Sequence, residues 1–260
     1  MQIYPIPTRP KNLYEKVTLR IGFNFGLCPL CGNYTVFTKW TEALRETGVC
    51  TACGARNRQR QIAYLLSRIY AKDGRFRSIS NTDLRIYNLE SKGSLHKVLA
   101  RNPNYVSSEF LGTGRSPGEI VGDLRHEDAH SLSFDDASLD LVISSDVWEH
   151  LPDPYTAHRE VYRVLRKGGR HVFTVPFYQG QFLDEQRARL NSDHSIEHLL
   201  DPIYHNDPLN PEGVLVFNIF SIEMLCRLSR IGFYTRFHKL YSRLHGILGN
   251  NGIIFEAVKQ

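Results

Sequence analysis

The stretch from residue 139 to 176, LDLVISSDVWEHLPDPYTAHREVYRVLRKGGRHVFTVP, carries the clearest fold signal in the chain. It opens with an apolar run, Leu139–Ser144, which is typical of a strand buried on both faces. The Asp-Pro pair at 153–154 is the pattern of a helix N-cap followed by the first helical residue. A glycine pair ends that helix, and a second apolar run follows over Arg170–Val175. The stretch therefore predicts a strand, a covering helix and a second, parallel strand.

Upstream, short apolar runs alternate with helical patterns from residue 84 onward. Leu84–Leu89 is expected as the first strand, with a helix over Leu95–Ala100 behind it. Tyr105–Ser107 is expected as the second strand, and a third is expected to begin at Glu119–Val121. Alternating strands and helices predict an α/β fold in which helices cover both faces of a mainly parallel sheet.

Acidic residues follow the first four of these units at nearly even spacing. They are Glu90, Glu109, Asp128 and Asp146, with intervals of 19, 19 and 18 residues. The carboxyl ends of parallel strands share one edge of a sheet, and ligands bind there. An acid about 20 residues after the first strand–helix turn is placed to accept from ribose hydroxyls, which favours Glu109 for that role.

Four of the five cysteines form two pairs, Cys28-x2-Cys31 and Cys50-x2-Cys53, separated by 18 residues. Two such pairs at this spacing are typical of a tetrahedral zinc site, and four thiolates leave no open position, so the zinc is expected to be structural. Nothing in the sequence indicates export, which disfavours disulfides.

A small module surrounds these cysteines in the prediction. Residues 34–40 alternate as a hairpin arm does, and the apolar face of 61–70 predicts a helix that packs on the main domain. We expect a zinc-ribbon or treble-clef module within residues 1–80 and the α/β domain within 81–260. Cys226 lies in an apolar helical pattern and is expected in the core.

The charge is divided unevenly between these two units. Residues 1–80 carry 13 Lys and Arg against 4 Asp and Glu, a net charge of +9, whereas residues 81–260 carry 19 against 23, a net charge of −4. The front basic residues include Arg56, Arg58 and Arg60. They are expected either to pair with the acidic domain or to contact phosphate, in RNA or in a phosphorylated substrate.

Membrane insertion and secretion find no support in the sequence. No apolar run approaches 18 residues, and the first residues lack the apolar segment of a secretory signal. We expect a cytoplasmic protein without a membrane span. The sequence says nothing of the oligomeric state.

The stretch at 139–176 resembles class I S-adenosylmethionine-dependent methyltransferases of the type 11 group, which share an EHLPDP…RVLKPGG passage. Asp128-Ala-His-Ser-Leu-Ser-Phe134 and the acidic segment after it resemble the passage that precedes this one in the family. The resemblance covers roughly residues 81–180. It implies a Rossmann-like sheet of seven strands whose last two, near Phe233 and over 252–258, are antiparallel.

The resemblance also implies an S-adenosylmethionine site. Glu109 would hold the ribose, Asp128 and the backbone N–H of Ala129 the adenine, and the residues after the fourth strand would border the methionine part. Family members usually have three alternating glycines after the first strand, and here only Gly93 remains, so a binding protein with a degenerate cofactor loop stays an alternative. The implied cofactor-binding residues are Glu90, Gly93, Glu109, Asp128, Ala129, Asp146 and Val147.

The candidate acceptor side lies near the fourth strand and in an insertion at about 177–216. We expect His150, His205 and Asp207 as catalytic residues, with a role in loop structure as the alternative. The insertion is rich in histidine, but no compact ligand spacing supports a second metal site. The expected acceptor is an O or N nucleophile of a small or saccharide-like molecule, and the alternative is ribosomal or transfer RNA bound by the basic module.

Overall fold

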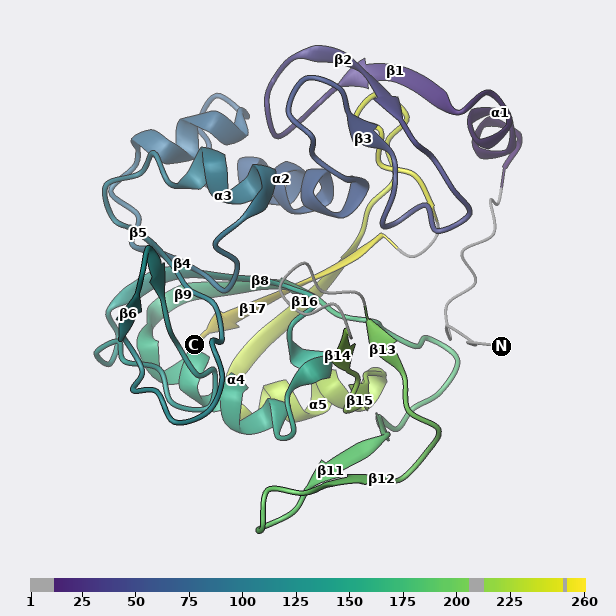
Figure 1. Cartoon of the computed structure of the whole chain (residues 1–260). Helices are drawn as coiled ribbons and strands as arrows, with labels where there is room; N and C mark the ends of the chain where they lie inside the picture. Colours follow the sequence, from purple (N-terminus) through teal and green to yellow (C-terminus); the bar gives the residue numbers. More distant parts are fainter. Residues whose placement is uncertain (1–11, 206–212, 250–251) are drawn as a thin grey trace.

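The structure, a computed structural model, describes residues 12–205, 213–249 and 252–260. Its central strands are β4 (Ile86–Asn88), β5 (Tyr105–Ser107), β8 (Leu139–Ser145), β9 (Leu165–Thr174), β16 (Phe233–Lys239) and β17 (Ile253–Lys259). Within the described residues they form a six-stranded sheet in the order β16-β17-β9-β8-β4-β5 (Figure 1). No helix in the described ranges is both long and apolar enough to cross a bilayer.

The strand directions match the expected α/β class. Strand β4 pairs in parallel with β5 and with β8, and β8 pairs in parallel with β9. Strand β17 runs antiparallel to both β9 and β16, as expected for the last two strands. The α/β prediction is therefore confirmed, and the ends of β4, β5 and β8 lie at one edge.

The expected third strand forms at Ile120–Val121, but its expected place in the central sheet is wrong. Ile120–Val121 (β6) pairs with Leu124–Arg125 (β7) in a separate antiparallel hairpin. An isolated parallel bridge from Glu109 to His126 lies nearby. The apolar run at β6 is only two residues long and Ile120 is 63% exposed, so it offers too little apolar surface for a buried strand. The described part of the sheet consequently has six strands instead of seven.

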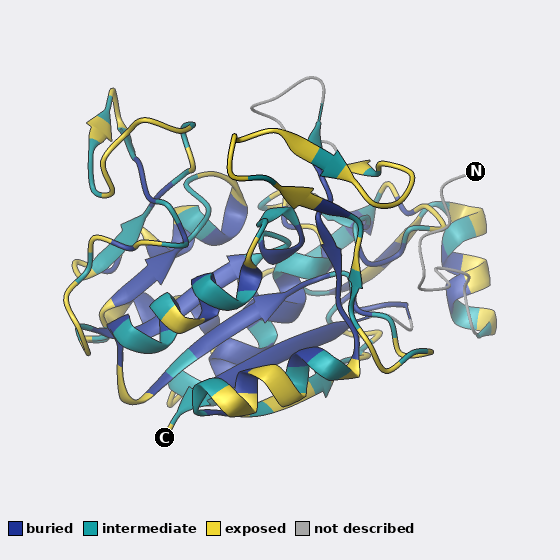
Figure 2. Cartoon of the chain, turned by 90° about the horizontal axis from the view of Figure 1, so that it is seen from below, coloured by how far each residue is buried: buried dark blue, intermediate teal, exposed yellow. Residues whose placement is uncertain are grey.

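Helices cover both faces of the sheet (Figure 1). The helices α2 (Asn57–Tyr70) and α3 (Gly93–Leu99) lie on one side with the short η1 (Phe76–Asn81), while α4 (Pro154–Val164) and α5 (Ile222–Ile231) lie on the other. Side chains of β8 alternate between the two cores, since Leu141 and Ile143 pack with the first and Val142 with the second. Figure 2 shows the central strands buried and the helices exposed on their outer sides.

Helix α4 begins where the sequence predicts. The Asp153 carboxylate accepts from the backbone N–H groups of Tyr155 at 3.1 Å and Thr156 at 3.0 Å, which satisfies donors that the first helical turn leaves unpaired. The helix ends at Val164, and β9 starts at once with Leu165. The second strand of the stretch 139–176 thus begins at Leu165, five residues before the expected Arg170.

The front module contains a three-stranded antiparallel sheet of β1 (Phe23–Leu27), β2 (Tyr34–Thr38) and β3 (Val49–Cys50), which follows helix α1 (Leu13–Ile21) and precedes α2. Ile62 and Leu66 of α2 are fully buried, as the apolar pattern predicts. They belong to one hydrophobic cluster that runs from Phe37 of the module to Ile86 and Ile254 of the central sheet. The module and the sheet therefore share a core.

The loop between β16 and β17 reaches into this module (Figure 1). The carbonyl of Leu244 accepts from the N–H of Leu27 at 2.8 Å, and a Cβ added to Gly26 would lie 2.0 Å from the same oxygen. Two buried side chains of α2 donate to the loop as well, Asn57 to Leu248 at 2.7 Å and Arg60 to Gly246 at 2.7 Å. Residues 244–248, near the end of the sequence, therefore form part of the core of the front module.

Short strands form the insertion between β9 and α5. Among them, β13 carries His205, whereas Asp207 lies outside the described residues. Cys226 of α5 is exposed, so its expected place in the core is wrong: it falls on the side of the amphipathic helix away from buried Met224 and Leu228. The insertion strands are β10 (Glu185–Gln186), β11 (Ala188–Leu190), β12 (Ile196–His198), β13 (Tyr204–His205), β14 (Val214–Leu215) and β15 (Asn218–Ile219).

Candidate functional site

The four paired cysteines come together in the front module. Their sulfur atoms all lie within 4.8 Å of one another, with 3.8 Å between Cys28 and Cys53 and 4.0 Å between Cys31 and Cys50. Four thiolates about 2.3 Å from a tetrahedral zinc ion are separated by about 3.8 Å. The donor set and its spacing therefore fit zinc.

The second group of residues lies at the carboxyl ends of β4 and β5. The Glu109 carboxylate accepts from the backbone N–H of Ser91 at 2.8 Å, which ties the end of β5 to the loop after β4. Two of the expected acids, Glu90 and Glu109, are thereby brought to one place.

The loop after β4 keeps buried polar atoms and one glycine that its backbone requires. Glu90 Oε2 and Ser91 Oγ are buried and make no hydrogen bond within the described residues. Gly93 has a φ of +84°, and a Cβ there would lie 2.9 Å from Gln59 Nε2 of the front module. Burial raises the pKa of Glu90 to about 7, against the opposing charge of Arg58. Buried polar atoms usually form hydrogen bonds, so these two atoms suit a bound ligand that carries hydrogen-bond donors.

Asp128 and Ala129 follow the β6–β7 hairpin. Asp128 Oδ1 accepts from the backbone N–H of His130 at 2.9 Å and lies 2.8 Å from His130 Nδ1. These contacts lower the pKa of the Asp128 carboxyl, so it is a carboxylate at neutral pH. Ala129 is buried against the second core.

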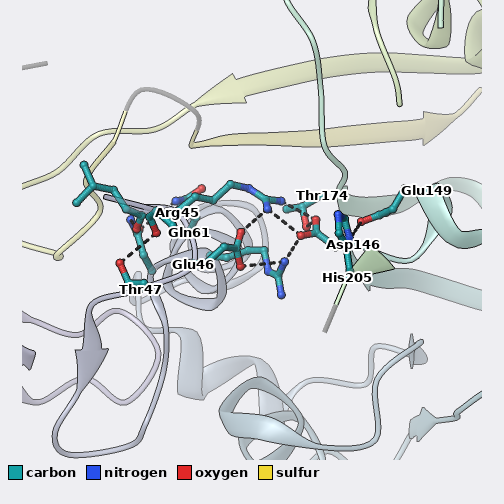
Figure 3. A network of polar contacts seen from close by, with 12 residues as sticks. Arg45, Glu46, Thr47, Gln61, Asp146, Glu149, Thr174 and His205 are labelled. Carbon is teal, nitrogen blue, oxygen red and sulfur yellow. Dashed lines mark hydrogen bonds and ion pairs between the residues drawn. The ribbon is translucent and has the colours of Figure 1, made fainter. Parts of the chain in front are cut away.

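Asp146 directly follows β8 and has a left-handed backbone conformation, with a φ of +54°. Its carboxylate accepts from two guanidinium nitrogens of Arg45, at 2.7 and 2.6 Å, from Arg58, and from Thr174 Oγ1 at 2.9 Å (Figure 3). Burial would raise the pKa of Asp146, but the two guanidinium charges hold it well below its usual range. Val147, next in the chain, accepts from the N–H of His150 at 3.0 Å.

The front arginines lie in different surroundings. Arg58 contacts Asp146, and Arg60 is buried, where it donates to backbone carbonyls and lies over the ring of Phe37. Arg56 is exposed. No local pattern singles out Arg45, because its partner Asp146 lies 101 positions away.

A further cluster forms beside Asp146. His150 Nε2 lies 3.7 Å and His205 Nδ1 3.6 Å from Glu149 Oε1, and the two imidazole rings meet edge to face at 5.0 Å. Figure 3 shows Asp146, Glu149 and His205 next to one another. Burial raises the pKa of Glu149 well above its usual value and lowers that of His205 to about 4.

The structure thus brings together two of the three expected catalytic residues, His150 and His205. Sequence reasoning missed Glu149 as their companion. The signal available was its position directly before His150, in a dipeptide at the end of a buried strand.

Part of the chain is similar to known methyltransferases. Residues 92–173 match the methyltransferase domain model Methyltransf_11. An uncharacterized methyltransferase of Mycobacterium sp. strain KMS is 44% identical over 82 residues, which are 28% of this chain and 32% of the relative. The chain therefore spans about a third of the length of that relative. Phosphatidylethanolamine N-methyltransferase of Cereibacter sphaeroides is 28% identical over 145 residues, 48% of this chain and 71% of the relative.

Two solved structures align over more of the chain. An S-adenosylmethionine-dependent methyltransferase from Mesorhizobium loti is 18% identical, with 68% of this chain and 91% of that chain covered and a TM-score of 0.43. The 1,6-didemethyltoxoflavin-N1-methyltransferase of Burkholderia thailandensis is 13% identical, with 78% of each chain covered and a TM-score of 0.44. The match of residues 92–173 to a methyltransferase domain model agrees with the resemblance drawn from the sequence.

Proposed function

We propose that this protein is an S-adenosylmethionine-dependent methyltransferase acting on an O or N nucleophile of a small or saccharide-like acceptor. The observation that carries the proposal is the edge formed by β4, β5 and β8 inside the matched domain. Carboxyl groups from successive units meet there, and Glu90 and Ser91 present buried polar atoms that lack partners in the described structure. A ligand with ribose hydroxyls and amino groups supplies the donors that such an edge accepts.

The roles within the cofactor site follow from this placement. Glu109 is suited to the ribose hydroxyls, while Asp128 and the backbone N–H of Ala129 are suited to the adenine edge. Glu90, Gly93, Asp146 and Val147 border the methionine part. S-Adenosylmethionine, when bound, supplies a methyl group activated by a positively charged sulfur.

The acceptor side lies beside the Glu149 cluster in this proposal. His150 and His205 are placed to orient the nucleophile of the acceptor. The histidine-bearing hairpin of β13 and β14 comes from the insertion, which suits a cover over a compact acceptor.

The front module, which we place within residues 1–80, contributes a wall to the site in this proposal. Ser94 at the start of α3 donates to the carbonyl of Cys53 at 2.6 Å, and Gln59 lies against Gly93. A structural zinc ion on the four cysteines would hold Arg58 and Gln59 at this edge. The proposed boundary near residue 80 therefore separates two units that build one site.

The basic charge of the module favours RNA as a second candidate acceptor. Against it, Arg45 and Arg58 are directed to Asp146, and Arg60 is buried. A gel-shift experiment across salt concentrations decides: an RNA methyltransferase shows binding that weakens steeply with salt, whereas an enzyme of small acceptors shows none.

Calorimetry with S-adenosylhomocysteine tests the proposed activity. We expect the parent protein to bind, and Asp128→Ala to weaken binding about tenfold through the lost acceptor of a hydrogen bond. Asp136→Asn is the control, since Asp136 is 78% exposed and pairs with Arg163 on the surface. Absence of binding at about 1 mM ligand supports instead a binding protein with a degenerate loop.

A further inference from the structure

We propose that Glu149, His150 and His205 form a second metal site, one for a divalent first-row transition-metal ion. Their ligand atoms lie within 4.8 Å of one another. One carboxylate and two imidazoles make a donor set typical of zinc, iron(II) and manganese(II) sites that keep open positions. This site is separate from the four cysteines.

The separations between the ligand atoms fit a shared ion. Glu149 Oε1 lies 3.7 Å from His150 Nε2 and 3.6 Å from His205 Nδ1. These distances exceed a hydrogen bond. Ligands about 2.1 Å from one ion and 110–120° apart are separated by about 3.4–3.6 Å. The three atoms therefore stand where a single ion bridges them.

The buried carboxylate is the strongest sign of a missing partner. Glu149 is 0% exposed, and neither of its oxygens has a hydrogen-bond partner within the described residues. Burying a carboxyl group without a partner costs free energy, so native structures rarely keep one. The positive charges of Arg45 and Arg58 are directed to Asp146 instead. A cation between the two histidines gives the Glu149 carboxylate the close polar contact that it does not make within the described residues.

The tautomer of His150 is set for a ligand. His150 Nδ1 lies 2.8 Å from the carbonyl oxygen of Leu215, which can only accept, so Nδ1 carries the proton. The lone pair of the neutral ring is then on Nε2, the atom that faces Glu149. Histidines that bind metals usually donate their other ring N–H in this way.

Hydrogen bonds to the backbone carbonyls of Glu149 and Leu151 hold the cluster together before any ion binds. The N–H of Phe217 donates to the carbonyl of Glu149 at 2.7 Å, and Asn218 donates to the carbonyl of Leu151 at 2.8 Å. These bonds fasten the segment of β14 and β15 to η2 (Trp148–His150). Since β14 pairs with β13, they also fix the hairpin that carries His205.

The position suggests what the ion does, and this step rests on the proposed methyltransferase function. Three protein ligands leave at least one coordination position for water or for an acceptor oxygen. A divalent ion lowers the pKa of an oxygen bound to it, so an acceptor hydroxyl there loses its proton more readily. The acceptor class favoured is therefore one with a hydroxyl able to reach this ion.

Mn²⁺ titration of the full chain tests the site, because thiolates select softer ions and Mn²⁺ therefore discriminates against the four cysteines. The signal of free Mn²⁺ in electron paramagnetic resonance reports binding directly. We expect one Mn²⁺ per chain, weakened at least about tenfold in both Glu149→Gln and His205→Ala. His198→Ala removes an exposed histidine from the same insertion and is the matched control with parent-like binding.

Two results overturn the assignment: no binding at about 1 mM Mn²⁺, or equal binding in the parent and both ligand variants. A loss in His198→Ala that equals the loss in His205→Ala overturns it too. Circular dichroism checks each fold, and His205→Ala, on a surface hairpin, serves if Glu149→Gln fails to fold. S-Adenosylhomocysteine binding, which depends on Asp128 and Glu109, reports failure of the proposed function separately.

Discussion

Two acids at the ends of neighbouring parallel strands, Asp146 after β8 and Glu90 after β4, meet opposite electrostatic surroundings. Asp146 accepts from Arg45, Arg58 and Thr174, and the guanidinium groups hold its pKa well below the usual range. Glu90 is also largely buried, yet one of its oxygens has no hydrogen-bond partner in the described structure, and its pKa is raised to about 7. Both arginines come from the front module. The module therefore determines which acid of the edge is already paired and which awaits a ligand.

The largest effect should come from removing two of the cysteines that we expect to hold a zinc ion in the front module. Cys28→Ser with Cys31→Ser leaves two thiolates, too few for a structural zinc ion. Because the module shares its core with the sheet, we expect a loss on the order of 5 kcal/mol or more in the free energy of unfolding, together with loss of S-adenosylhomocysteine binding. Elemental analysis for zinc, thermal unfolding and calorimetry measure these changes.

Cys226→Ser is the matched control, since this exposed thiol lies far along the chain in α5. It should keep the zinc content and the unfolding midpoint of the parent. An unchanged midpoint in the double variant would show that the module is not held by metal.

Breaking the pair at Asp146 should be the next largest effect. Arg45→Met leaves a buried carboxylate with one guanidinium fewer, and loss of a partner from a buried pair costs about 3 kcal/mol. Adding Asp146→Asn should restore part of that loss, because the charge left behind is removed. Denaturant unfolding of the two single variants and the double variant measures the coupling. Additive losses would contradict the direct pairing of these residues.

The pH dependence of cofactor binding tests Glu90. With a pKa of about 7, Glu90 ionises as pH rises through neutrality, and its carboxylate accepts from ligand donors better than the acid does. Affinity for S-adenosylhomocysteine should rise about tenfold from pH 6 to pH 8, and Glu90→Gln should flatten this rise. Equal slopes in parent and variant would contradict the assignment. The charged groups around Glu90 are Arg56, Arg58, Glu109 and Asp146.

The raised pKa of Glu90 should also lower the stability of the ligand-free protein as pH rises. The folded pKa of Glu90 lies above its usual value of 4.5, so folding takes up a proton between these two values. The ligand-free protein should therefore lose the stability that this group contributes as pH rises from about 4.5 through about 7. Glu90→Gln should remove this part of the pH dependence of unfolding.

Substitution of the exposed Asp136 should change the free energy of unfolding least, and it serves as the reference for the other variants. Asp136 pairs with Arg163 and is 78% exposed. Asp136→Asn should change the free energy of unfolding by about 0.3 kcal/mol, because solvent screens such pairs. Denaturant unfolding checks this value, and a loss as large as that of Arg45→Met would remove the contrast between buried and surface pairs.

Local patterns were enough to predict much of this molecule. The buried run at β8, the Asp-Pro start of α4 and the spacing of the cysteine pairs each depend on neighbours in sequence, and the structure contains all three. Three of the four acids, Glu90, Glu109 and Asp146, follow parallel strands of the central sheet as expected, whereas Asp128 follows the separate β6–β7 hairpin.

Long-range pairings were beyond the reach of such patterns. Arg45 is 101 positions from Asp146. His205 is brought to Glu149 by the pairing of β13 with β14 and by hydrogen bonds from Phe217 and Asn218 to the segment after β8. The short run at β6 had the composition of a strand but too little apolar surface to enter the sheet. Cys226 shows the same limit, since an apolar helical pattern does not say which side of α5 faces the core.

The loop between β16 and β17 bears on the order in which the chain can mature during synthesis. Asn57 and Arg60 are buried in the module, yet each donates to a carbonyl that lies 191 or 186 positions later. The cysteines leave the ribosome long before that loop and can take up their metal early. The core of the module can close only after residues 244–248 have emerged, long after the cysteines themselves.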